Sequence, residues 1–111
     1  MDAWARGLSA AMTVCDRDGK ILDMNDRAGK TFDKEGGLGL IGSNVLDCHP
    51  EPARTKLKAL LASGRSNCYT IEKKGVRMLI YQSPWSENGK YHGFVEISLE
   101  IPEKMPHFKR D

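Results

Sequence analysis

Short runs rich in apolar and β-branched residues, separated by glycine-containing turns, predict the strands of this chain. The runs are Ala11–Cys15, Lys20–Met24, Asn67–Lys73, Val76–Ser83 and Tyr91–Leu99. Asp-Gly at positions 18–19 and Asn-Gly at 88–89 favour tight hairpins, because glycine accepts a positive φ. In the last run apolar residues at 91, 95, 97 and 99 alternate with polar ones, which predicts one core face and one polar face.

The clearest helix is predicted over Glu51–Ser63. Pro52 lies near its first turn and Gly64 follows its last residue, which is the usual asymmetry of helix ends. Its apolar stripe is formed by Ala53, Leu57, Leu60 and Leu61. The pattern predicts that this helix is the main cover of the sheet.

Two shorter helices are also predicted. Asn25 ends the second strand and can cap a helix over Asp26–Phe32. Asp2 can cap a helix that runs to Ala11 and places Trp4 and Leu8 on one face, together with Ala11 or Met12. Between the helix over Asp26–Phe32 and the long helix, the glycine-rich segment 33–42 is interpreted as an irregular, mobile connection.

The order of these elements predicts an α+β fold with a single sheet. Hairpins at both ends make the sheet largely antiparallel, and the helices are left to cover one face.

The 17 basic and 15 acidic residues leave a net charge of +2, which argues against a nucleic-acid partner. No apolar run is long enough for a membrane helix, and we expect no membrane partner. Three widely spaced cysteines predict free thiols in a reducing cytoplasm.

Three ordered segments resemble the PAS family of sensor domains. Val14–Asn25 is similar to the opening hairpin of that family, and Leu40–Asp47 followed by His49-Pro50 is similar to the stretch before its long helix. Ser83-Pro84-Trp85 and Glu87-Asn88-Gly89, followed by Gly93–Ile97, resemble its closing hairpin. The match extends over nearly the whole chain, from Ala11 to Leu99.

This resemblance implies a PAS-like fold: a five-stranded antiparallel sheet of order 2-1-5-4-3, cupped on one face by short helices and one longer helix. It divides the chain into an N-terminal flanking helix (1–10), a PAS domain (11–101) and a C-terminal tail (102–111). Leu99-Glu100-Ile101-Pro102 stands where PAS modules of larger proteins continue into a signalling helix. If the chain is complete, its output is delivered to a signalling protein in trans.

The candidate reactive residues predict neither a catalytic nor a metal site. Adjacent Cys48 and His49 could hold haem or sense redox state, but the predicted long helix contains no histidine, where haem-binding PAS sensors usually place their ligand. Val45 occupies the position of the reactive cysteine of light-oxygen-voltage domains, which argues against a cysteinyl-flavin adduct and leaves non-covalent flavin binding open. We therefore expect a protein that is not an enzyme, with its cofactor unknown.

The sequence thus predicts a small cytoplasmic sensor that binds a ligand or cofactor in a cavity and signals through protein contacts. The alternative is a ligand-free PAS module that serves only assembly. A homodimer through Trp4, Leu8 and Met12 is expected, because so short a helix must dock its apolar face to persist. The cavity is predicted to be lined by apolar residues: Met12, Val14, Phe32, Leu46, Leu57, Leu61, Met78, Ile80 and Val95.

Overall fold

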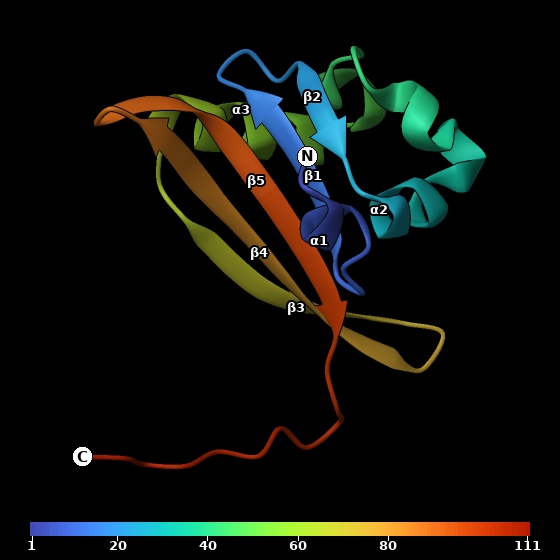
Figure 1. Ribbon diagram of the computed structural model, residues 1–111, viewed down its shortest axis with the longest axis vertical. Helices are drawn as coiled ribbons and strands as arrows, with labels where there is room; N and C mark the ends of the chain where they lie inside the picture. The colour runs from blue at the N-terminus through green and yellow to red at the C-terminus, as the bar shows by residue number, and fades with distance from the viewer.

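A single antiparallel sheet, of order β2-β1-β5-β4-β3, organises the computed structural model, which describes residues 1–111 (Figure 1). This is the strand order that the resemblance implied. The elements in chain order are α1 (Ala3–Arg6), β1 (Ala11–Asp16), β2 (Ile21–Met24), α2 (Asp26–Thr31), the 3₁₀ helices η1 (Asp33–Glu35), η2 (Gly37–Leu40) and η3 (Val45–Cys48), then α3 (Ala53–Ser63), β3 (Asn67–Lys73), β4 (Val76–Glu87) and β5 (Lys90–Glu100). The tail after Ile101 leaves the sheet without secondary structure.

The predicted strands and the two later helices are confirmed with small shifts of their ends. Asn25 caps α2 as expected, its side chain accepting a hydrogen bond from the Ala28 amide. The helix α3 begins two residues later than predicted. It ends at Ser63, and the following Gly64 adopts the left-handed backbone conformation. The glycine-rich connection contains η1 and η2, and Gly29 of α2 packs directly against Leu38 of η2.

The N-terminal helix is much shorter than the sequence predicted. It ends at Arg6, followed by Gly7, and Ala11 already belongs to β1. The buried Asn25 side chain supplies one physical reason: its Nδ2 donates to the Ala5 and Ala10 carbonyl oxygens, holding residues 7–10 in a non-helical path. A continuous stripe of Trp4, Leu8 and Met12 on one helix therefore does not exist, and that prediction is wrong.

The two faces of the sheet differ in what covers them. Cys15 and Phe94 are buried with Leu61 of α3, so their side chains point to the helical side. Because neighbouring residues on a strand point to opposite faces, Val14 and Val95 point away from α3. Figure 1 shows α3 behind β1 and β5, and α1 in front of them. On that front side, the Met1 ammonium and Arg6 lie within 4 Å of Asp23 of β2, at 3.2 and 3.7 Å.

The core occupies only part of the helical side. One cluster joins Ala11, Ile21, Met24 and Ala28, and a second joins Cys15, Leu61 and Phe94. Every residue of β3 is exposed, as are the first two of β4. The helices therefore cover β1, β2 and β5 and leave the inner surface of β3 and of the first residues of β4 open, whereas Ile80 farther along β4 is buried. No helix has the length and apolar character needed to cross a bilayer.

Candidate ligand-binding cleft

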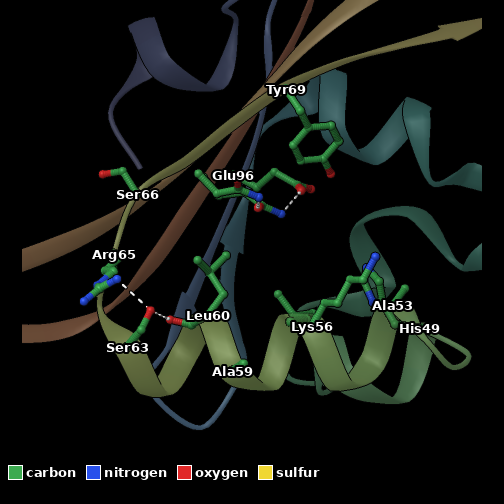
Figure 2. A pocket seen from close by; sticks show the side chains of 13 residues that line it. His49, Ala53, Lys56, Ala59, Leu60, Ser63, Arg65, Ser66, Tyr69 and Glu96 are labelled. Carbon is green, nitrogen blue, oxygen red and sulfur yellow. Dashed lines mark hydrogen bonds between the residues drawn. The ribbon is translucent and has the colours of Figure 1, made fainter.

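A cleft of about 640 Å³ separates α3 from the sheet (Figure 2). We call it the α3 cleft. This volume lies within the roughly 300–1,000 Å³ range of small-molecule sites. Residues of α3 and its flanks form one wall, and inward-facing residues of β3, β4 and β5 form the other: His49, Ala53, Lys56, Leu57, Ala59, Leu60, Ser63, Arg65, Ser66, Asn67, Tyr69, Gln82 and Glu96.

The cleft exists because α3 is attached to the sheet mainly at its C-terminal end. There Leu61 is buried against Cys15 and Phe94, and the Tyr91 hydroxyl donates to the Leu61 carbonyl oxygen at 2.7 Å. Toward the N-terminal end, Leu57 is only half-buried and Ala53 is exposed. The prediction that α3 closes over the sheet is therefore correct at one end of the helix only.

The sheet wall of the α3 cleft is polar. The Asn67 Nδ2 donates to Gln82 Oε1 at 3.0 Å, and the Gln82 Nε2 donates to Glu96 Oε1 at 2.9 Å. This chain of hydrogen bonds crosses from β3 through β4 to β5 and orients the Glu96 carboxylate. Tyr69 lies on the same wall, and its pKa is raised by burial and by the negative charge of Glu96. The wall thus presents a fixed carboxylate beside a phenol.

The helix wall carries the opposite charge. Lys56 of α3 and Arg65, just past its end, both line the cleft. His49 lies near Lys56, and its Nδ1 donates to the Val45 carbonyl oxygen at 2.6 Å, which leaves Nε2 without the proton in the neutral ring. Neither basic side chain forms an ion pair with Glu96: the three ion pairs of the chain lie elsewhere.

The α3 cleft ends in a small apolar recess of about 50 Å³. Cys15, Val45, Leu57, Leu60, Leu61 and Phe94 supply its apolar surface. Burial is the main cause that raises the pKa of the Cys15 thiol, partly offset by a hydrogen bond from the Phe94 backbone. The neutral thiol therefore behaves as a small apolar group here. A ligand would meet polar groups along the cleft and an apolar surface at its inner end.

The predicted lining residues separate into several places. Leu57 and Leu61 line the recess, Leu46 packs against the same cluster, and the buried Ile80 faces the same side. Phe32 packs against the other core cluster. Met78 lines a different cavity of about 510 Å³, between residues 8–11, α2 and the ends of β4 and β5.

The remaining three predicted residues lie on the opposite face. Met12, Val14 and Val95 alternate with Thr13, Cys15, Phe94 and Glu96, all of which line the recess. Their assignment to the cavity is therefore wrong. The error came from β5, where the apolar face was taken as the core face, whereas the face toward α3 carries Phe94, Glu96 and Ser98.

Sequence reasoning missed the polar wall for the same reason. Glu96 and Gln82 look like solvent-facing residues in an alternating strand, and nothing local distinguishes them from such residues. Lys56 was missed because it falls outside the apolar stripe of α3.

Cys48 and His49 lie together outside the core. Both are exposed, and the Cys48 Sγ lies 4.0 Å from the Asn44 carbonyl oxygen. No group of three or more His, Cys, Asp or Glu side chains is arranged to hold a metal ion. All three cysteines are free thiols in this structure. Of this pair, only His49 lines the α3 cleft.

Comparison with known proteins gives structural relatives only. No family model matches the chain, and no curated protein matches it. Among solved structures, a C-terminal domain from Streptococcus mutans has a TM-score of 0.70 at 22% identity, covering 87% of this chain and 79% of that one. The PAS domain of Bordetella pertussis BvgS has a TM-score of 0.66 at 16% identity, with 90% and 82% covered.

A third likeness agrees with these. The PAS domain of an HTR-like protein from Haloarcula marismortui has a TM-score of 0.60 at 16% identity, covering 89% of this chain and 92% of that one. The five-stranded antiparallel sheet of order β2-β1-β5-β4-β3 with its few helices agrees with this architecture. This chain is a domain with the PAS fold.

Proposed function

We propose that this domain is a sensor module that binds a small molecule in the α3 cleft and transmits the binding event through contacts with other protein chains. The observation that carries the proposal is the cleft itself. It is large enough for a small ligand, it opens to solvent along α3, and its sheet wall holds an ordered network of polar side chains. The proposed role is non-catalytic and cytoplasmic, where the free thiols stay reduced.

The attachment of α3 supports a way to transmit binding. Because α3 is held by Leu61 and Tyr91 at one end, a ligand between its other end and the sheet would change how the helix packs. The 3₁₀ helix η3 lies between β2 and α3 along the chain and packs its Val45 and Leu46 on the same cluster. Closure of α3 on a ligand would therefore alter the cluster that touches β1 and β5.

The opposite face of the sheet supports a contact with a second copy. The name outer face is used here for the outward residues in the middle of the central strands: Met12, Val14, Leu79, Tyr81, Ser83, Val95, Ile97 and Leu99. None of them is charged, whereas a solvated antiparallel sheet face is normally polar. The charged outward residues Asp16 and Arg77 lie at the ends of these strands. The helix α1 lies on the same side of the sheet (Figure 1), and its Trp4 is 69% exposed. A homodimer would bury this surface, with Trp4 as its expected anchor.

A ligand-free assembly module is the second candidate, favoured by the uncharged outer face. The two candidates are separated by native mass spectrometry of the protein after incubation with a small-molecule extract of cells. We expect a retained ligand mass on the wild type. Leu60→Trp should abolish it, because Leu60 points into the cleft (Figure 2). Leu22→Trp, exposed on β2, is the control and should retain the ligand.

The outcome that contradicts ligand sensing is a bare protein mass throughout. The same holds for a ligand that is retained equally by Leu60→Trp. Either result would leave the assembly module as the function.

A further inference from the structure

The two walls of the α3 cleft carry opposite charges that do not neutralise each other. The Glu96 carboxylate on the sheet wall is half-buried, and of its two oxygens only Oε1 accepts a hydrogen bond, from Gln82. Lys56 on the helix wall forms no ion pair. The cleft separates the Glu96 carboxylate from the Lys56 ammonium. Each group can therefore pair with an opposite charge on a bound ligand.

We propose that the ligand of the α3 cleft is a small zwitterion of amino-acid type, with a short aliphatic side chain. This inference rests on the proposed function and names its ligand class. The ammonium group would bind Glu96 Oε2 and the acidic group would bind Lys56, in charge-assisted hydrogen bonds. The aliphatic group would enter the apolar recess beside Leu57, Leu60 and Phe94.

The polar wall favours an ammonium group over a neutral donor. Asn67 and Gln82 each spend one of their two N–H donors on the chain toward Glu96, and the only charged group on this wall is the Glu96 carboxylate, whose Oε2 stays free to accept. Tyr69 and Glu96 both line this wall, so the phenol and the carboxylate border the same cleft (Figure 2). A cation between them would stabilise the carboxylate that the fold leaves without a partner.

The basic side chains of the helix wall argue against a simple amine. Lys56 and Arg65 would both repel a ligand that carries only positive charge. A ligand with an acidic group turned toward α3 removes this repulsion. Arg65 lies at the opposite end of the cleft from Lys56 and His49, so we assign the acidic group to Lys56 (Figure 2).

The test uses three probes that share one carbon skeleton: leucine, 3-methylbutylamine, which lacks the carboxylate, and 4-methylpentanoate, which lacks the ammonium. Dissociation constants come from titrations followed by amide NMR signals of the cleft residues, with probes up to about 10 mM. We expect leucine to bind at least ten-fold more tightly than either fragment.

The variants assign each charge to its partner. Glu96→Gln keeps the shape and the bond from Gln82, and should weaken leucine and 3-methylbutylamine roughly ten-fold while leaving 4-methylpentanoate unchanged. Lys56→Gln should weaken leucine and 4-methylpentanoate and spare the amine. Glu87→Gln and Lys58→Gln, both exposed and outside the cleft, are matched controls that should change nothing.

Several outcomes would overturn the inference. If either fragment binds as tightly as leucine, the charged group that this fragment lacks does not contribute to binding. If Arg65→Gln abolishes 4-methylpentanoate binding and Lys56→Gln does not, the assignment of the acidic group to Lys56 is wrong. If leucine shifts no cleft signal while an extract component still binds and is lost in Leu60→Trp, the ligand class is wrong and the sensor function stands. If neither binds, both fall.

Discussion

Asn25 joins three separate parts of the chain through one fully buried side chain. Its Oδ1 accepts from the backbone amides of Met12 and Ala28, and its Nδ2 donates to the carbonyls of Ala5 and Ala10. All of the hydrogen-bonding capacity of the amide is thereby used. The same residue ends β2, caps α2 and fixes the N-terminal segment against β1.

Replacing Asn25 by Asp should lower the free energy of unfolding by about 2–4 kcal/mol. The carboxylate would face two carbonyl oxygens in place of the amide donors, and a buried group left without its partner costs ~1–3 kcal/mol. Urea denaturation measures the loss. Asn88→Asp, in the exposed turn between β4 and β5, is the control and should change stability by less than about 0.5 kcal/mol. Equal stabilities would show that Asn25 is not the junction.

Cys15 should be the last of the three thiols to be alkylated in the native protein. It is 6% exposed, and burial raises its pKa, so less of the reactive thiolate forms at a given pH than at an ordinary thiol. Cys48 and Cys68 are exposed and serve as internal comparators. Mass-resolved labelling with iodoacetamide from pH 7 to 9 ranks them. Labelling of Cys15 as fast as Cys68 would contradict the packing of α3 on β1.

At the scale of elements, α3 has one firm end and one loose end. Leu61 is 4% exposed and lies in the core, whereas Leu57 is half-buried beside the cleft. Leu61→Ala should therefore cost about 2–5 kcal/mol of unfolding free energy. Leu57→Ala should cost less than half as much, because the side chain already borders open space. Comparable urea midpoints for the two variants would show that α3 packs evenly along its length.

The strands show how far the sequence predicts this fold. Turn glycines and apolar runs located every strand, and hairpins at both ends fixed an antiparallel sheet. Which face of β5 met the helices could not be read from alternation, because the outer face is as apolar as a core while the inner face holds Glu96 and Ser98. The proposed roles, protein contact on the outer face and ligand binding on the inner wall, would account for this reversal of the usual polarity.

The length of α1 was unpredictable for a different reason. The residues 2–11 carry a helical pattern, and the buried Asn25 side chain overrides it from another element by taking the Ala5 and Ala10 carbonyls. Such tertiary hydrogen bonds leave no mark in the local sequence. The candidate site depends equally on tertiary pairing, since Asn67, Gln82 and Glu96 meet only through the register of three strands.

At the scale of the whole molecule, the domain offers the α3 cleft on one side of its sheet and the outer face on the other. We expect a homodimer through the outer face. At tens of micromolar protein, Tyr81→Lys or Trp4→Ala should convert this dimer to a monomer, because each substitution removes exposed apolar contact area. Phe108→Ala, which removes an exposed aromatic side chain from the tail, is the control. Light scattering decides it, and a wild-type monomer would rule out this interface.

The central claim is that the α3 cleft receives a ligand, and mapping amide NMR shifts on addition of a cellular small-molecule extract tests it most directly. The account predicts saturable shifts at Lys56, Leu60, Gln82 and Glu96, which line the cleft, and smaller ones at Leu79, which faces outward. Shifts confined to the outer face, or no shifts at all, would contradict it.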